Sequence, residues 1–168
     1  MKEIFYFPVL IIIYLFGCQT DKPVLDNNIK KQISDSLSNV AISFLHSWEP
    51  PFNSDKALSL FTQSDDFNLV IDGFKTESYS EWAEGVPNYM ADDNYFFKLY
   101  THEIKDIKTV VLSPGSGVVT ITYIWENISK DDVHKKVDGA ITLTCRKEDN
   151  KWKIVHYHGS HGEERIID

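Results

Sequence analysis

The segment from Tyr95 to Gly159 alternates apolar and polar residues with a period of two, which predicts a sheet of long antiparallel strands. Between the strands, short runs of Gly, Pro, Ser, Asp and Asn have the composition of tight turns, so each strand is expected to pair with the one before it. A sheet of this kind needs one face covered by other elements. The predicted strands are Tyr95–Leu112, Gly117–Asn127, Val133–Lys147 and Lys151–Gly159.

Before these strands the sequence is predicted to be mainly helical. Apolar residues recur at helical spacing from Ile29 to Trp48, as on one face of a long helix, and Pro50-Pro51 ends that helix. Asn53-Ser54-Asp55 provides capping residues for a short second helix. Farther along the chain, Asp72-Gly73 is a strong signal for a hairpin turn.

A third helix is predicted to begin at Ser78, because Ser78 followed by Glu81 fits a capping box. Gly85 and Pro87 are expected to interrupt this helix. Helices followed by long antiparallel strands predict an α+β fold, in which a long N-terminal helix and two shorter helices pack on one face of a curved sheet.

The first residues have the pattern of a signal that is removed from the mature protein. The apolar run from Ile4 to Phe16 is too short for the roughly 20 residues of a membrane-spanning helix. It ends in Leu15-Phe16-Gly17-Cys18, which resembles the lipobox of bacterial lipoproteins. The resemblance implies cleavage after Gly17 and a lipid on Cys18, which would anchor the protein in the bacterial cell envelope, at the outer membrane or periplasmic face. The alternative is a buried N-terminal strand or helix with a chance cysteine.

This interpretation divides the chain into a signal peptide at 1–17, lipidated Cys18 with a polar tether at 18–28, and a single domain at 29–168. A lipidated Cys18 leaves Cys145 alone, so no internal disulfide is expected and Cys145 is interpreted as a packing residue. The formal charge of −8 argues against nucleic acid as a partner, because an acidic domain repels phosphate backbones. Membrane attachment would come from the lipid and not from a basic face.

The last predicted strand carries the most specific resemblance to a known family. Trp152, Ile154, His158 and Ser160 fit the W-x-I-x-x-x-H-x-S ending that is common in SnoaL-like domains. With the order of its elements, the chain resembles the nuclear-transport-factor-2-like superfamily, which includes ketosteroid isomerase and the SnoaL-like polyketide cyclases. The resemblance implies a cone-shaped, cystatin-like roll in which sheet and helices enclose a cavity.

Strand alternation predicts which side chains of the last strand face that cavity. Trp152 is assigned to the inward face because its bulk is hard to leave in water, and a period of two extends this assignment along the strand. The inward residues are then Trp152, Ile154, His156, His158 and Ser160. Lys153 and Tyr157 are expected to face away, and His161 to lie solvated in the turn that follows.

Three roles remain open for the two inward histidines. His156 and His158 can be neutral and hydrogen-bonded to neighbouring strands, they can orient a small apolar ligand, or they can bind a metal together with His102 or Glu103. No metal is expected, because the sequence contains no Cys pair and no H-E-x-x-H helix. The candidate pocket residues are Tyr79, Trp82, Tyr123, Trp125, His156, His158 and Ser160.

Two classes of function follow from these observations. The favoured one is a binding module that holds a small apolar or amphipathic ligand, or an assembly module that forms a homodimer through the sheet face. The alternative is a cofactor-free enzyme of the isomerase, cyclase or hydratase type, with His158 or Asp72 as general base. Asp72 can instead hydrogen-bond its own turn. No cofactor is expected, since the sequence shows no Gly-rich phosphate loop.

Replacement of Cys18 tests the predicted anchor. The Cys18→Ala variant is expected to lose fatty-acid labelling and to accumulate as the unprocessed precursor, because the lipid is attached to that thiol. Metabolic labelling followed by electrophoresis measures both effects. Cys145→Ala is the matched control and should stay labelled. Equal labelling of Cys18→Ala and the wild type would contradict the lipoprotein interpretation.

Overall fold

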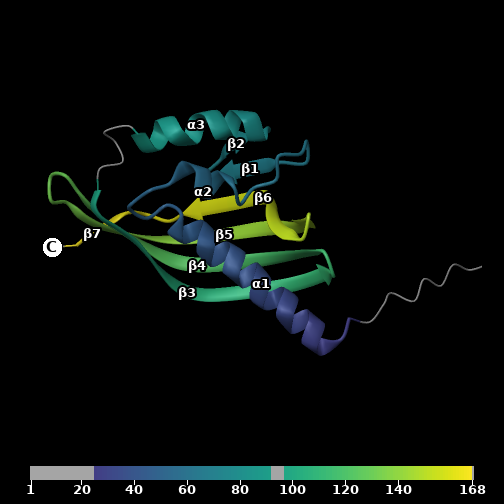
Figure 1. Ribbon diagram of the computed structural model, residues 1–168. Coiled ribbons are helices and arrows are strands. Elements are labelled where there is room, and N and C mark those ends of the chain that lie inside the picture. Colours follow the sequence, from purple (N-terminus) through teal and green to yellow (C-terminus); the bar gives the residue numbers. More distant parts are fainter. Residues whose placement is uncertain (1–24, 92–96, 168) are drawn as a thin grey trace, which may run out of the picture.

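The computed structural model describes residues 25–91 and 97–167 (Figure 1). The predicted signal peptide, the predicted lipidation site Cys18 and most of the tether lie outside these residues. Within the described ranges, no helix combines the length and the apolar character needed to cross a membrane.

The described part of the chain contains three helices that follow local sequence signals. They are α1 Asn27–His46, α2 Ser54–Leu58 and α3 Tyr79–Ala91. The Asp26 carboxylate caps α1 by accepting a hydrogen bond from the backbone N–H of Asn28 at 2.7 Å. The Asn53 side chain caps α2 in the same way, accepting from the backbone N–H of Lys56 at 2.9 Å.

The third helix corrects one prediction, because α3 continues through Gly85 and Pro87. It starts as predicted, and the Ser78 hydroxyl accepts a hydrogen bond from the backbone N–H of Glu81 at 3.2 Å. A proline removes one helical hydrogen bond and crowds the preceding turn, but packing elsewhere on the helix can outweigh this cost. Val86, which is 2% exposed, supplies such packing in the same turn.

The strands of the described residues form one seven-stranded sheet. They are β1 Asn68–Ile71, β2 Phe74–Thr76, β3 Phe97–Ser113, β4 Ser116–Ser129, β5 His134–Glu148, β6 Lys151–His161 and β7 Arg165–Ile166. Their order is β2-β1-β6-β5-β4-β3, and β7 pairs with β5. The antiparallel strands β3 to β6 confirm the four predicted ones. β1 pairs with β6 in parallel, which the sequence pattern did not predict.

The predicted hairpin turn forms at Asp72-Gly73. Both residues have positive φ, 47° for Asp72 and 87° for Gly73, as two-residue hairpin turns require. Ile71 and Phe74 are the last residue pair before the turn. Because β1 lies beside β6, the turn brings Asp72 close to the end of β6, and the Asp72 backbone N–H donates to the Gly159 carbonyl oxygen at 3.2 Å.

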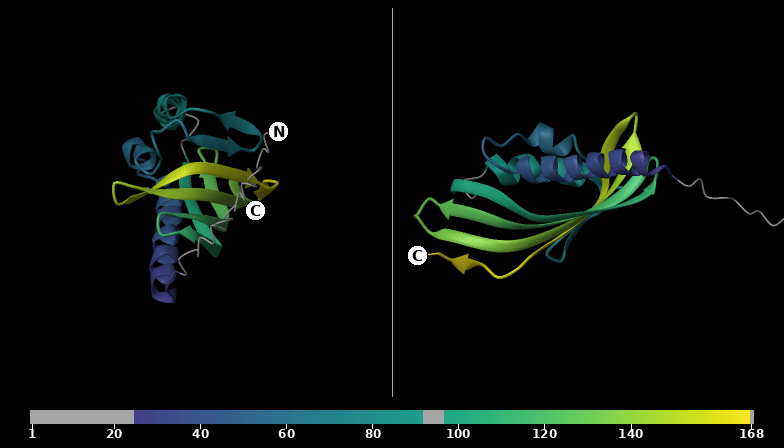
Figure 2. Two further views of the ribbon diagram at one scale, coloured as in Figure 1. Left: turned by 90° about the vertical axis from the view of Figure 1, so that its right-hand side faces the viewer. Right: turned by 90° about the horizontal axis from the view of Figure 1, so that it is seen from below.

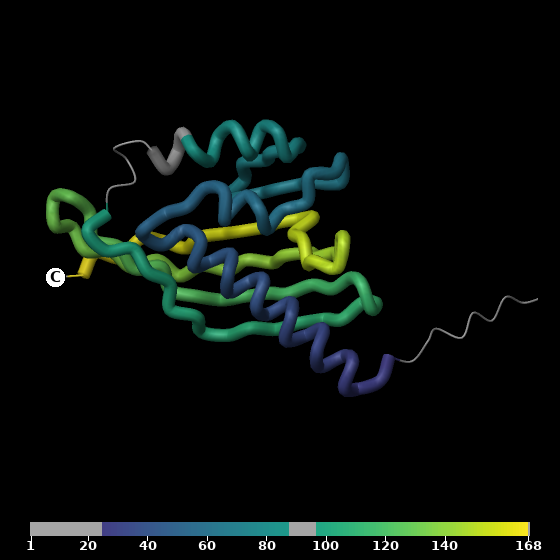
Figure 3. Tube along the Cα trace, in the orientation of Figure 1, coloured from purple at the N-terminus to yellow at the C-terminus, as the bar shows by residue number. Residues whose placement is uncertain are grey.

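The helices cover one face of the curved sheet (Figures 1 and 2). α1 crosses the strands β3 and β4 obliquely, as the chain trace shows (Figure 3). Its buried side chains are Ile33, Leu37, Ala41, Phe44 and Leu45. They form one apolar core with inward residues of the sheet such as Val119, Ile121, Leu143 and Ile154. The predicted α+β class, a curved sheet wrapped on a long helix and two shorter ones, is confirmed.

A β-bulge in β6 changes which side chains face the helices. Ile154 pairs with Cys145 and His156 pairs with Thr144, so Val155 has no partner on β5. One extra residue in a strand shifts the alternation of its side chains by one position. The inward face of β6 therefore changes at Val155.

The predicted orientation is wrong for the part of β6 beyond this bulge. Tyr157 is 3% exposed and faces the helices, and His161 follows on the same face. His161 is the last residue of β6 and pairs with Gly139, so it lies in the strand and not in a turn, although the residue is exposed as predicted. The predicted inward residues His156, His158 and Ser160 lie on the outer face of the sheet instead.

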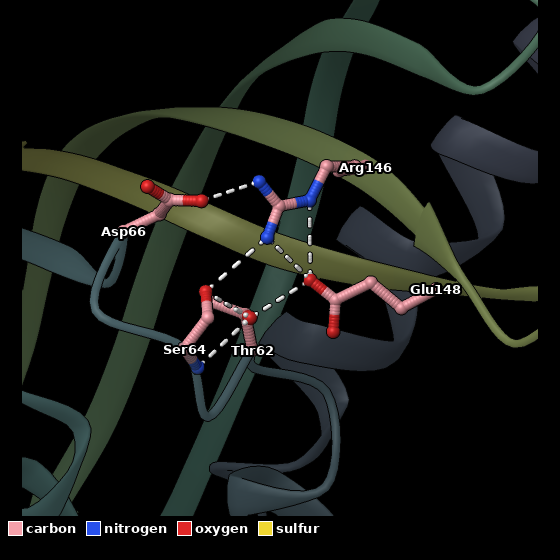
Figure 4. A network of polar contacts seen from close by, with 5 residues as sticks. All are labelled: Thr62, Ser64, Asp66, Arg146 and Glu148. Atoms are coloured by element: carbon pink, nitrogen blue, oxygen red, sulfur yellow. Dashed lines mark hydrogen bonds and ion pairs between the residues drawn. The ribbon is translucent and has the colours of Figure 1, made fainter.

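Arg146 links the segment after α2 to the end of β5 through hydrogen bonds and ion pairs (Figure 4). Its guanidinium donates hydrogen bonds to the Asp66 carboxylate, to Glu148 Oε1 and to the Ser64 hydroxyl. The buried hydroxyl of Thr62 donates to the same Glu148 oxygen at 2.8 Å. This network holds the segment that leads into β1, and so it supports the position of the β1–β2 hairpin.

Close packing of α1 on Gly117 of β4 can be tested by adding one methyl group. A Cβ at Gly117 would overlap the Leu37 side chain and lie 2.9 Å from the Val110 carbonyl oxygen. Gly117→Ala is expected to lower the free energy of unfolding by about 1–3 kcal/mol, as overpacking a core does. In the control Gly115→Ala, the new Cβ meets only the Cβ of Lys147, at 3.8 Å, and the change should stay below about 0.5 kcal/mol. Urea denaturation measures both, and equal effects would contradict the packing argument.

Candidate active site

A cavity of about 700 Å³ lies between the helices, the β1–β2 hairpin and the inward face of the sheet. Most of its walls are apolar or aromatic. The helical side contributes Phe44, Leu45, Trp48, Glu81, Trp82, Gly85 and Val86. The hairpin contributes Leu69, Ile71, Asp72, Phe74 and Thr76, and the long strands contribute Tyr100, His102, Tyr123, Trp125, Tyr157 and His161. The size and lining are those of a small-molecule site.

Some of the predicted site residues line this cavity and others do not. Those in the cavity are Asp72, Trp82, Tyr123 and Trp125. Tyr79 lies outside it, where its ring packs edge-on against Phe67 with ring centroids 6.0 Å apart. The remaining candidates, His156, His158 and Ser160, are on the outer face because of the bulge in β6.

Asp72, His161 and Tyr123 form a hydrogen-bonded chain in the cavity wall. The Asp72 carboxylate accepts from the backbone N–H of His161 at 2.9 Å and lies 2.7 Å from the ring Nδ1 of that residue. The other ring nitrogen, Nε2, is 3.1 Å from the Tyr123 hydroxyl. The hairpin turn thus places the Asp72 carboxylate against one ring nitrogen of His161, and the Tyr123 hydroxyl contacts the other.

The protonation states along this chain follow from burial and hydrogen bonding. Burial alone would raise the pKa of Asp72, but hydrogen bonds from the ring and backbone N–H of His161 outweigh it and hold the pKa below its usual value. Burial raises the pKa of Tyr123 to about 12, and the nearby Asp72 charge adds to this effect. At neutral pH Asp72 is therefore ionised and Tyr123 keeps its hydroxyl proton.

A second carboxylate contacts another histidine of the cavity wall, His102. Glu49, just past the end of α1, accepts from the backbone N–H of His102 at 2.9 Å, and the same oxygen is 3.3 Å from the ring Nδ1. Its other oxygen is 2.7 Å from Nδ1 of His46. The His102 side chain is only 5% exposed, whereas that of His46 is 48% exposed. Glu49 thus connects a buried histidine of the cavity to an exposed one at the end of α1.

Burial also sets the protonation state of this second pair. It lowers the pKa of His102 to about 4, although the hydrogen bond and charge of Glu49 act in the opposite direction. Burial alone would raise the pKa of Glu49, but hydrogen bonds from His46 and His102 keep it below its usual value. At pH 7 His102 is neutral and Glu49 is ionised. When Nδ1–H of His102 faces Glu49, Nε2 has a lone pair that can accept a proton.

A proton acceptor, His102, and a proton donor, Tyr123, lie side by side in the cavity wall. The rings of His102 and Tyr123 are neighbours, with centroids 5.2 Å apart. A neutral imidazole that can accept a proton and a phenol that can donate one therefore line the same apolar cavity. General acid–base catalysis requires this combination.

In the ranges 25–91 and 97–167, no three side chains of His, Cys, Asp or Glu are arranged to hold a metal ion. Cys145 is completely buried in β5, and burial raises the pKa of its thiol to about 12. This placement confirms the interpretation of Cys145 as a packing residue.

Sequence reasoning missed Glu49 and His161 and considered His102 only as a metal ligand. Glu49 is 53 residues from His102, and Asp72 is 89 residues from His161, so no local spacing connects either pair. Alternation within the predicted strand was the available signal for His102, because it shares an inward face with Tyr100.

Comparisons with known sequences agree with this architecture. The family model described as "SnoaL-like domain" matches residues 52–162, which is more than half of the chain. No curated protein sequence matches the chain.

Solved structures with a similar fold include several proteins of bacterial origin. A candidate scytalone dehydratase from Novosphingobium aromaticivorans has a TM-score of 0.71 at 11% identity, with 85% of this chain and 93% of that chain covered. The hexachlorocyclohexane dehydrochlorinase LinA-type3 from Novosphingobium barchaimii has a TM-score of 0.68 at 10% identity, covering 84% and 94%. A nuclear-transport-factor-2-like protein from Salmonella enterica has a TM-score of 0.67 at 15% identity, covering 80% and 94%. At these identities the likeness shows the fold alone.

The low pKa of His102 predicts a pH-dependent stability. An unfolded His102 takes up a proton near pH 6.5, whereas the native ring does so near pH 4, so the unfolded state binds more protons between these values. Stability contributed by the neutral ring is therefore complete above pH 6.5 and is lost as the pH falls towards 4. At about 1.36 kcal/mol per pH unit, the loss approaches about 3 kcal/mol.

Urea denaturation between pH 7 and pH 4.5 measures this loss. His102→Gln should remove most of the pH dependence in this range, because the substituted side chain does not titrate. His158→Gln, on the outer face, is the matched control and should keep the wild-type slope. The explanation fails if His102→Gln leaves that slope unchanged.

Proposed function

The chain belongs to the SnoaL-like domain family, and we propose that it is a cofactor-free enzyme that eliminates a small group from a ring-sized, mostly apolar molecule. One observation carries the proposal: the neutral, buried His102 and the phenol of Tyr123 line one cavity, and each is connected to its own carboxylate. A pure binding cavity has no need of two oriented proton-transfer groups beside each other.

In the proposed step, Nε2 of His102 removes a proton from a carbon of the bound molecule. The electron pair of the broken C–H bond forms the new double bond, and the leaving group departs with the electron pair of its own bond. A hydroxide leaving group takes the hydroxyl proton of Tyr123 and departs as water, and the proton held by His102 returns to the Tyr123 oxygen to complete the cycle. A chloride leaves as the anion without taking a proton, and His102 then releases its proton to solvent. Glu49 stabilises the His102 imidazolium that results, and Asp72 holds His161 in position.

The names of two structural neighbours support this reaction class. One is a candidate dehydratase and the other a dehydrochlorinase, so both names describe removal of a small molecule from a substrate. Their identities to this chain are low, and the proposal therefore rests on the residues of the cavity.

The second candidate function is ligand binding without catalysis, which is the function that the sequence pattern favoured. The mostly apolar lining of the cavity supports it, because such a lining holds an apolar ligand without any chemical step. We also propose that the domain is anchored to the cell envelope through Cys18. The support for this location is the Leu15-Phe16-Gly17-Cys18 pattern.

An elimination assay distinguishes the two functions. The chain from Gln19, which lacks the predicted signal peptide and lipidation site, is incubated with 3-hydroxycyclohexanone, whose dehydration to the conjugated enone is followed by ultraviolet absorbance. It is also incubated with hexachlorocyclohexane, and chloride release is measured. The wild type is expected to accelerate at least one reaction. His102→Gln and Glu49→Gln should reduce that rate by about 10²–10⁴-fold, the usual contribution of a positioned base.

His158→Gln is the matched control, since this histidine lies on the outer face of β6. It should retain the wild-type rate. The proposed mechanism is wrong if His158→Gln loses as much activity as His102→Gln. Tight binding of these compounds with no turnover would favour the binding role.

A further inference from the structure

Exposed apolar side chains gather at the end of the molecule where α1 begins. Ile29, in the first turn of α1, is 45% exposed, and Val110 and Leu112, near the end of β3, are 57% and 60% exposed. The start of α1 and the end of β3 lie at the same end of the structure (Figures 1 and 2). Single apolar residues on a surface are ordinary, whereas a group of them in one place indicates a surface for contact.

The apolar face of α1 continues past the edge of the sheet. Ile33 and Leu37 of this face are buried, and Ile29 comes one helical turn before Ile33. α1 crosses β3 where the Ser34 hydroxyl forms a hydrogen bond with the hydroxyl of Thr109. Since β3 is the last strand in the order of the sheet, the turn that contains Ile29 lies beyond the sheet edge.

Val110 and Leu112 extend this apolar surface onto the outer face of β3. Thr109 faces α1, so the alternation of side chains turns Val110 to the opposite face, and Leu112 follows it there. Val118 of β4 pairs with Val110 and adds half-buried apolar surface beside it. Ile29, Val110 and Leu112 are called the tether-side patch below.

The charges around the tether-side patch balance, although the whole chain has a formal charge of −8. Lys31 forms an ion pair with Asp35 at 2.7 Å, and Lys108 lies 3.5 Å from Asp106. Lys30 has no acidic partner in the described ranges. Apolar side chains flanked by lysines suit the surface of a bilayer, because the apolar groups enter the headgroup region while ammonium groups meet lipid phosphates.

The length of the tether keeps this surface close to the predicted lipid. Residues 19–26 separate Cys18 from α1, and a chain of this length spans at most about 30 Å when fully extended. A lipid on Cys18 would therefore hold the tether-side patch within reach of the bilayer. Even a weak contact is populated on so short a linker, because its effective concentration is in the millimolar range.

We propose that the tether-side patch docks on the lipid bilayer, with its apolar side chains inserted among the headgroups. The inference rests on the proposed anchor at Cys18 and adds a second contact, which fixes the orientation of the domain. His102 of the cavity lies on the same strand as Leu112, about 30 Å away at roughly 3.3 Å per residue. The cavity is then held away from the bilayer and receives its ligand from the aqueous side.

Partition into vesicles tests the docking surface. The chain from Cys18 is coupled at this thiol to a maleimide that carries one myristyl chain, whereas the buried Cys145 does not react. One acyl chain gives only marginal, reversible membrane binding, so the effect of a second contact is measurable. Binding to vesicles of phosphatidylethanolamine and phosphatidylglycerol is followed by sedimentation. Leu112→Gln is expected to lower the partition coefficient about fivefold and Val110→Thr about twofold, since each removes apolar surface from the contact.

Ile166→Gln is the matched control, because Ile166 is 68% exposed but lies at the opposite end of the sheet, in β7 (Figure 1). It should keep the wild-type partition, and thermal unfolding verifies that each variant is folded. Equal partition of Leu112→Gln and the wild type would overturn the inference, and so would an equal loss in Ile166→Gln. A dimer of the uncoupled chain that Leu112→Gln dissociates would assign the patch to a second copy and would also overturn it.

Amide hydrogen exchange on the vesicles checks the orientation. The backbone N–H groups of the turn at 113–116 should exchange more slowly than in solution, because this turn directly follows Leu112. Those of the Asp72-Gly73 turn, beside the cavity, should keep their rate. Slower exchange in the Asp72-Gly73 turn alone would place the cavity against the bilayer and contradict the proposed docking.

Chemical coupling of the lipid separates this inference from the proposed anchor, since partition then does not depend on processing in the cell. Fatty-acid labelling of Cys18 in cells, with equal partition of Leu112→Gln and the wild type, would support the anchor and overturn the docking surface. Absence of labelling in cells, with partition that depends on Leu112, would support the docking surface and contradict the anchor.

Discussion

The chemistry of the cavity depends on one unpaired residue in β6. Val155 has no partner on β5, and the alternation of side chains shifts there by one position. Tyr157 and His161 consequently face the helices, whereas His158 faces outward. Burial fixes this register, because Tyr157 is 3% exposed and a slip by one residue would put it in water. The identity of the polar groups in the cavity therefore follows from a backbone irregularity.

The carboxylates that contact the two cavity histidines come from different layers of the fold. Asp72 comes from a hairpin whose parallel pairing with β6 places the turn at the end of that strand. Glu49 comes from the end of α1 and reaches across to β3. Each carboxylate orients one histidine, but the environments of His102 and His161 differ: the first is almost fully buried, and the second contacts a phenol. Different environments are how a site assigns different proton-transfer roles to similar groups.

Two glycines make room for the phenols of the cavity. A side chain at Gly139 or Gly159 would overlap Tyr123 or Tyr157, respectively. Backbone space at these positions thus sets where the hydroxyls lie among the aromatic walls of the cavity.

The sequence by itself determined the α+β class, the four long strands, the long first helix and the hairpin at Asp72-Gly73, because periodicity and turn chemistry are local properties. It also indicated that Tyr123 and Trp125 share the inward face of their strand. Only the tertiary structure decided which polar residues meet in the cavity wall. The contacts of Glu49 with His102 and of Asp72 with His161 join residues 53 and 89 positions apart. The bulge at Val155 arises where two strands and a core must fit together, and a strand read alone carries no sign of it.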